Sequence, residues 1–177
     1  MALEVGEEDR RALVAWARGA VGEDRGMRVV DPAQVHLTLA FLGHRSLDEV
    51  PELEALVEGL ALRAAPALRT AGGLWLSPRR PHVLTVAVED AGGALARVHD
   101  RVWRGLEGLG FEREARPYRP HLTVARVRHG WTAPSAALPP LPPRPLTAGA
   151  VVLMRSWLGG GPARYEALAR REFGTES

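Results

Sequence analysis

The chain contains 177 residues, 46% of them hydrophobic and 25% charged, which is the composition of one folded domain rather than of a disordered, collagen-like or coiled-coil protein. All 23 basic residues are arginine and cysteine is absent, so a Schiff base, a P-loop, a protein-kinase site, a lysine-adenylate ligase, a disulfide scaffold and a thiol nucleophile are excluded. The net charge is only +2, which by itself is weak support for a nucleic-acid partner.

The N-terminal residues, MALEVGEEDRR, are acidic and contain no apolar stretch of the kind that a signal peptide needs. Nowhere does an apolar run approach the length of a membrane span. We therefore expect a soluble cytoplasmic protein that does not bind membranes. Cysteine is absent and Gln34 is the only glutamine, and this depletion of thermolabile side chains, together with 14 prolines, predicts a thermophilic source.

The first half of the chain predicts two helices and one clear strand. Residues 7–21 place Leu13, Val14, Ala17 and Val21 at helical spacing behind an acidic first turn. Residues 35–42 are apolar and precede a glycine, which predicts a strand. Apolar residues return at helical spacing over residues 48–63, which predicts a second helix.

The second half predicts more strands around a single helix. Residues 68–76 and 82–88 are expected to be strands joined by the turn-like SPRRP sequence, and residues 92–109 a helix. A strand begins at His121. The six prolines within residues 134–145 predict an extended loop, followed by strands at 148–157 and 164–170. The Gly159-Gly160-Gly161-Pro162 run between these last strands predicts a hairpin turn rather than a phosphate loop.

The chain repeats itself at an offset of about 85 residues. HLTLA begins at His36 and HLTVA begins at His121. At the same offset Ala2-Leu3-Glu4 falls on Ala87-Val88-Glu89, and the first helix falls on the third. We therefore expect one domain spanning residues 1–177, built from two related strand–helix–strand units. A duplicated fold can also repeat such residues for packing alone, so the motifs do not prove a site.

Strand geometry gives the two motifs a mechanical meaning. Side chains alternate along a strand, so His36 and Thr38 share one face, and His121 and Thr123 do the same in the second unit. A pseudo-two-fold relation would place two imidazoles and two hydroxyls across one cleft. Displacement at phosphorus needs a base, an acid and donors to the phosphoryl oxygens, and these four residues supply them.

The paired HxTx motifs closely resemble those of the two-histidine phosphoesterase superfamily. Within that superfamily, the chain looks most like the RNA 2′,3′-cyclic phosphodiesterases, also called 2′-5′ RNA ligases. Three segments carry this narrower resemblance: VHLTLAFLG, RPYRPHLTVARV and GPARYEALARREF. The resemblance implies a bilobal α+β fold, a pseudo-two-fold duplicated unit with antiparallel sheets lining a central cleft and helices packed outside. It implies hydrolysis of 2′,3′-cyclic phosphate ends of RNA, or of related nucleotides, to 2′-phosphates, without metal or other cofactor. The reverse type of reaction would join RNA ends through a 2′-5′ linkage without ATP.

The resemblance also implies roles for individual residues. His36 would be the general acid, His121 the general base, and Thr38 and Thr123 would bind the phosphate. No obligate protein partner is implied, and we expect a monomer. The family usually begins with a fuller first strand than this chain has, so we expect either a short first strand or, as we favour, a native start upstream of Met1.

Arginines near the second motif are further candidates for the phosphate. Arg126 lies in the HLTVAR context of the family, but strict alternation points it away from the His121 face unless a bulge or twist brings it round. Arg116 and Arg119 precede the motif and can equally be surface residues.

The other four histidines give no site of their own. His44 and His129, a repeated pair, are expected to be loop residues, and no supporting residues accompany His82 or His99. The sequence has no HExxH, DxD or His-x-His cluster, so we predict no metal site.

Two alternatives remain open at this point. The chain could be a non-catalytic protein that binds RNA ends or nucleotides, or a cyclic phosphodiesterase acting on a small nucleotide derivative. A binding assay that shows affinity without product would favour the first. Comparison of activity on RNA ends and on small cyclic nucleotides would test the second.

Overall fold

The computed structural model describes residues 1–77, 80–134, 137–157 and 164–174. The helices in these residues are α1 (Glu7–Val21), α2 (Val50–Glu58) and α3 (Ala94–Gly108), with short 3-10 turns at Pro32–Gln34 and Leu47–Glu49. The strands are β1 (Ala2–Val5), β2 (Met27–Val29), β3 (His36–Thr38), β4 (Leu68–Leu76), β5 (Val83–Glu89), β6 (His121–Val127), β7 (Pro145–Leu146), β8 (Ala148–Trp157) and β9 (Arg164–Glu172).

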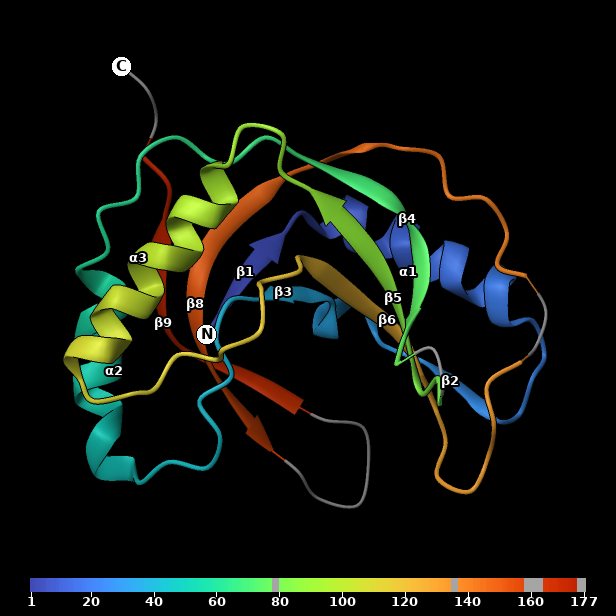
Figure 1. Cartoon of the computed structure of the whole chain (residues 1–177), viewed down its shortest axis with the longest axis horizontal. Coiled ribbons are helices and arrows are strands. Elements are labelled where there is room, and N and C mark those ends of the chain that lie inside the picture. The colour runs from blue at the N-terminus through green and yellow to red at the C-terminus, as the bar shows by residue number, and fades with distance from the viewer. Residues whose placement is uncertain (78–79, 135–136, 158–163, 175–177) are drawn as a thin grey trace.

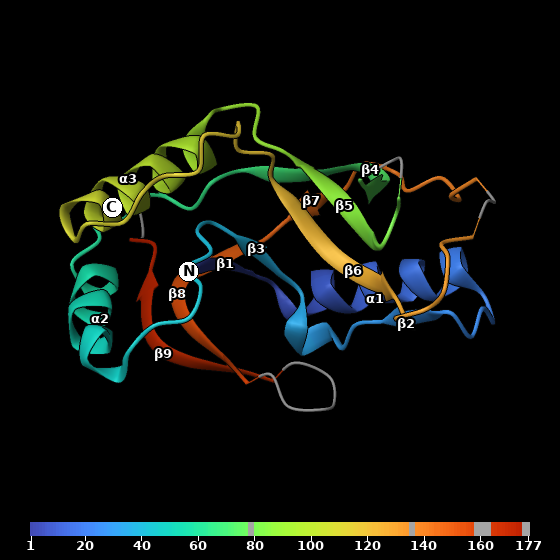
Figure 2. The same ribbon diagram turned by 60° about the horizontal axis from the view of Figure 1, so that its bottom comes forward.

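All the described strands belong to one antiparallel sheet. Their order is β7-β4-β5-β6-β3-β1-β8-β9, and β2 pairs with β6. The sheet is strongly curled, with α2 and α3 beside β8 and β9 at one end and α1 behind the strands at the other (Figures 1 and 2). The predicted α+β class, with helices outside antiparallel strands, is confirmed. The two halves share a continuous sheet because β3 pairs with β6.

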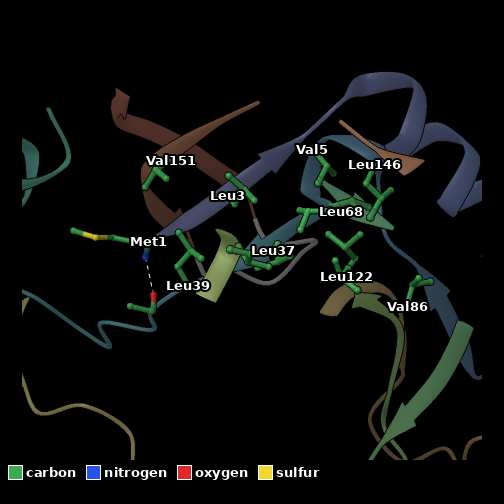
Figure 3. Packing of buried hydrophobic residues seen from close by; sticks show 14 of the residues in the cluster. Met1, Leu3, Val5, Leu37, Leu39, Leu68, Val86, Leu122, Leu146 and Val151 are labelled. Carbon is green, nitrogen blue, oxygen red and sulfur yellow. Dashed lines mark hydrogen bonds between the residues drawn. The ribbon is translucent and has the colours of Figure 1, made fainter. Parts of the chain in front are cut away.

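The hydrophobic core lies between the helices and one face of this sheet. Leu3, Leu37, Leu122 and Val151 come from four neighbouring strands and are completely buried on that face. They form a single cluster with the apolar sides of all three helices, and Figure 3 shows the strand residues at its centre. Burying such side chains contributes on the order of 2 kcal/mol each, so the apolar alternation fixes which face of every strand points inward.

The predicted helices and strands are largely confirmed, but several limits differ. The second helix occupies only Val50–Glu58, because Gly59 ends it. The expected strand at 35–42 keeps only His36–Thr38, since the next two backbone N–H groups both donate to the Met1 carbonyl and leave the ladder. Pro145 begins the edge strand β7 next to β4, a position where a residue without an N–H is tolerated.

Two predicted features are wholly or partly outside the described residues. The glycine run at 159–161 lies outside them, and so does the centre of the turn at 77–81. No helix among the described residues is long and apolar enough to cross a membrane.

Strand pairing shows that the predicted alignment of the two repeated units is wrong at their first strands, β1 and β5. Leu3 of β1 pairs with Leu37 of β3, and Val86 of β5 pairs with Leu122 of β6. Leu3 therefore corresponds to Val86, whereas the sequence match placed it on Val88. The predicted equivalence of Ala2-Leu3-Glu4 with Ala87-Val88-Glu89 is two residues out of register, although the two HxT strands correspond as predicted.

Candidate active site

The two HxT motifs lie on neighbouring strands of the sheet. Leu37 in β3 is directly opposite Leu122 in β6, and both side chains are buried in the core. Residues opposite each other in an antiparallel pair point to the same face, and their neighbours along each strand point to the other face. The remaining residues of the motifs therefore lie together on the face away from the core: His36, Thr38, His121 and Thr123.

The antiparallel register crosses the two motifs. With Leu37 opposite Leu122, His36 lies beside Thr123, and Thr38 lies beside His121. Each imidazole thus neighbours the hydroxyl of the other motif. The two histidines are diagonal neighbours on adjacent strands, and residues in this relation are roughly 7–8 Å apart. A phosphate group between them would be within reach of both imidazoles and both hydroxyls.

A bulge in β6 brings Arg126 to the same face. In the β5–β6 ladder Thr85 pairs with Thr123 and Val83 pairs with Arg126, with a register shift between them. The shift lies between Leu84 and Thr85, which makes Val124 the extra residue in β6, and Val124 and its neighbour Ala125 are both completely buried. The alternation therefore restarts after the bulge, and Arg126 is exposed on the side of the HxT residues. Strict alternation predicted the opposite face.

A backbone carbonyl orients the His121 imidazole. His121 Nδ1 lies 2.8 Å from the carbonyl oxygen of Arg119, and a carbonyl can only accept, so this nitrogen carries the proton. The Gln34 backbone also lies near His36, but the buried His36 Nδ1 has no hydrogen-bond partner among the described residues. Fixing Nδ1 of His121 leaves its Nε2 for proton transfer to or from a substrate.

The environment of His36 favours its neutral form. Burial lowers its pKa below 6.5, and this desolvation is the largest cause. The neighbouring Gln34 backbone raises the pKa, while the positive charges of the N-terminal amine and of Arg126 lower it further. Arg126 is therefore close enough to act electrostatically on His36.

Two residues near His36 were missed by the sequence analysis. The Tyr165 ring in β9 contacts the His36 ring edge to face, with centroids 5.1 Å apart and an interplanar angle of 76°. Glu4 in β1 is directly opposite His36, and its carboxylate accepts a hydrogen bond of 3.0 Å from Arg170 Nε. Tyr165 lies within GPARYEALARREF, which carried part of the family resemblance, but only strand order brings that segment to His36.

The remaining candidates do not join this group. His44 and His82 are exposed. His99 is buried and stacks on Tyr118, with ring centroids 3.8 Å apart. Arg116 and Arg119 are exposed, and only the Arg119 carbonyl touches a motif residue.

Acidic and imidazole side chains do not gather into a metal-binding group of three or more anywhere in the described residues. The chemistry available on this face is therefore that of the motif residues themselves. It comprises two imidazoles, two hydroxyls and one guanidinium. Such a set can bind a phosphoryl group and exchange protons on two of its sides.

Comparison with known proteins identifies relatives by sequence. Residues 11–159 match the family model described as the 2′-5′ RNA ligase superfamily. A Thermus thermophilus protein named RNA 2′,3′-cyclic phosphodiesterase is 35% identical over 142 residues, which cover 76% of this chain and 69% of that protein. A protein of the same name from Aeropyrum pernix is 29% identical over 109 residues, 62% of each chain.

Solved structures show the same architecture. A crystal structure of a Thermus thermophilus protein superposes with a TM-score of 0.80 at 32% identity, covering 97% of this chain and 95% of that one. The Escherichia coli LigT protein, crystallised with 3′-AMP, gives a TM-score of 0.78 at 22% identity, covering 98% and 96%. At that identity LigT supports the fold alone.

Proposed function

Because the chain belongs to the 2′-5′ RNA ligase superfamily, we propose that it hydrolyses 2′,3′-cyclic phosphate ends of RNA, or of related nucleotides, to 2′-phosphates. The observation that carries the proposal is the crossed register of the HxT motifs, which puts two imidazoles, two hydroxyls and Arg126 on one face. Its relatives from Thermus thermophilus and Aeropyrum pernix carry the corresponding name.

In the proposed reaction His121 Nε2 accepts a proton from water as the water oxygen bonds to phosphorus. The bond from phosphorus to the 3′ oxygen breaks, and that oxygen takes the proton held by His36 Nε2. The 2′ ester remains, so the product is a 2′-phosphate beside a free 3′-hydroxyl. Thr38, Thr123 and Arg126 donate to the non-bridging oxygens and stabilise the charge that develops on them.

The lowered pKa of His36 suits an acid that must give up its proton readily. The negative charge of a bound phosphate would favour the protonated form of His36 and so offset the effects of burial and of Arg126. A 5′-hydroxyl in place of water would open the same cyclic phosphate and leave a 2′-5′ linkage. One chain supplies both motifs, so a monomer acting on cytoplasmic RNA is part of the same proposal.

Product analysis tests this function. Purified protein is incubated, with EDTA present, with an RNA oligonucleotide that ends in a 2′,3′-cyclic phosphate, and the product is identified by chromatography and ³¹P NMR. We expect a 2′-phosphate. A 3′-phosphate would contradict the assigned leaving oxygen, and tight binding without product would favour a non-catalytic RNA-end protein.

A further inference from the structure

A basic pocket continues the catalytic face beyond Arg126. Its volume is about 280 Å³, and it is lined by Arg28, Arg126, Val127, Arg128 and His129. Strand β2 and the end of β6, which carry or adjoin these residues, lie at the end of the molecule far from α2 and α3 (Figures 1 and 2). Arg126 takes part in both places, because it lines this pocket and its charge also reaches His36.

Strand pairing places the pocket on the same face as the HxT residues. Arg28 in β2 is directly opposite Arg126 in β6, so the two side chains leave the sheet on the same side. Arg128 follows β6, and its backbone N–H donates to the carbonyl of Gly26 at 2.7 Å. This bond extends the contact between the two segments and holds Arg128 next to Gly26, diagonally across from Arg28.

The arginines of this pocket have no acidic partner among the residues that the structure describes: Arg28, Arg126 and Arg128 form no ion pair there. By contrast, Arg144 pairs with Asp9 at 3.1 Å and Arg170 pairs with Glu4 at 3.0 Å. Three unneutralised guanidiniums around one cavity form a strong site for an anion, and their planar forks match phosphate oxygens.

An exposed tryptophan stands next to the pocket. Trp131 closes a turn in which its N–H donates to the Arg128 carbonyl at 3.1 Å, and Gly130 in this turn has a φ of 81°. The Trp131 indole lies against the backbone of Gly26, where a Cβ would come within 2.6 Å of the ring. Trp131 is nevertheless 55% exposed, so part of its ring is open to a ligand.

We propose that this pocket binds a phosphate on the 5′ side of the reacting nucleotide, and that Trp131 stacks on a base of the same strand. In an RNA that ends in a cyclic phosphate, every other phosphate lies on the 5′ side of the reacting nucleotide. A second phosphate site on this face therefore favours an RNA strand over a single nucleoside as substrate. Basic grooves with exposed aromatic rings are a common way to hold single-stranded RNA. The inference rests on the proposed function and narrows its substrate class.

A substrate series tests the proposal. Three substrates carry the same 2′,3′-cyclic phosphate: a nucleoside, the same nucleoside with a 5′-phosphate, and a tetranucleotide. We expect kcat/KM of the unmodified protein to rise along the series. In an R28A/R128A double variant, kcat/KM on the tetranucleotide should fall at least about tenfold more than on the nucleoside, since each lost guanidinium removes a phosphate contact.

A matched control removes two charges elsewhere. R63A/R104A lowers the net charge equally, and both of its arginines are exposed near α2 and α3. The slope of log(kcat/KM) against log[salt] for the tetranucleotide should weaken by roughly one unit per arginine in R28A/R128A and stay unchanged in the control. Trp131→Ala should reduce only the tetranucleotide rate, and Trp131→Phe should restore most of it.

Any of three outcomes would overturn the subsite. The first is an equal loss of kcat/KM on all three substrates in R28A/R128A, and the second is the same kcat/KM for all three substrates in the unmodified protein. The third is the same salt slope in both double variants. If the unmodified protein hydrolyses none of the substrates, the proposed function has failed instead. The subsite is then judged by fluorescence anisotropy of the labelled tetranucleotide. Weaker binding in R28A/R128A than in R63A/R104A supports it, and equal binding overturns it.

Discussion

Leu37 lies directly opposite Leu122 where strand β3 meets strand β6. This contact between two buried leucines joins the two halves of the sheet. It also sets the arrangement of the active face, because it places His36 beside Thr123 and His121 beside Thr38. A shift of either strand by one residue would turn its own histidine and threonine into the core, so the packing of the leucines and the position of the motif side chains depend on the same register.

Loss of either motif hydroxyl should weaken phosphate binding. Thr123→Val and Thr38→Val each remove one donor to the non-bridging oxygens, and hydrogen bonds to charged groups are worth enough for a loss of roughly 10- to 100-fold in kcat/KM. Steady-state kinetics on a cyclic-phosphate RNA end measure the loss. Thr123→Ser and Thr38→Ser keep the hydroxyl and should retain most activity. Equal losses in the Val and Ser variants would contradict the role.

Removal of the Arg126 charge should raise the pKa of His36. The positive guanidinium disfavours the imidazolium, so Arg126→Gln makes protonation of His36 easier. NMR titration of the His36 Cε1–H resonance should show a pKa below 6.5 in the unmodified protein and a higher one in the variant. As His36 is the proposed acid, the alkaline limb of the pH profile should move to higher pH. An unchanged or lower pKa would refute the proximity.

Tyr165 should position the His36 ring by packing against it. An aromatic contact of this kind contributes about 0.5–1.5 kcal/mol, so Tyr165→Ala should lower kcat by roughly 2- to 10-fold. It should also raise the pKa of His36 as water reaches the ring. Tyr165→Phe keeps the ring and serves as the control. If the Phe variant lost as much kcat as the Ala variant, the hydroxyl would be the relevant group.

Asp9 should be important for stability rather than catalysis. It is 6% exposed and accepts hydrogen bonds from Arg144 and from the backbone N–H of Thr147, which ties α1 to the segment before β8. Asp9→Ala leaves these donors without a partner and should cost about 3 kcal/mol of unfolding free energy.

Urea unfolding followed by circular dichroism measures the loss for Asp9→Ala. Glu7→Ala is the matched control in the same helical turn. Glu7 pairs with the exposed Arg11 at the protein surface, so that variant should lose less than about 1 kcal/mol. Similar losses in the two variants would show that the buried contacts of Asp9 contribute little.

Local patterns in the sequence predicted most elements of the fold. The apolar spacing of Leu13, Val14, Ala17 and Val21 indicated the limits of α1, and these four residues are buried as predicted. Strand β2 was missed because three residues are too few to show alternation. The register of the first repeat was misplaced because strand pairing follows the buried leucines, while the sequence match followed Glu4 and Glu89.

The motif residues were predicted from the sequence, but their surroundings were not. Strand alternation correctly put each histidine and its threonine on one face. The bulge that turns Arg126 to that face leaves no clear sign in the sequence, because Val124 and Ala125 are both ordinary buried residues. Tyr165 and Arg28 reach the site through pairing of distant strands, which local patterns do not encode.

His36 and His121 are proposed to act as one acid–base pair, a claim that the kinetics of three variants can test. His36→Ala, His121→Ala and the double variant are assayed on RNA with a 2′,3′-cyclic phosphate end, with His44→Ala as an exposed control and thermal melts to check folding. We predict that each single variant loses roughly 10²- to 10⁴-fold in kcat and that the double variant is little worse. Turnover near the unmodified rate in either single variant, or losses that simply multiply in the double variant, would contradict the claim.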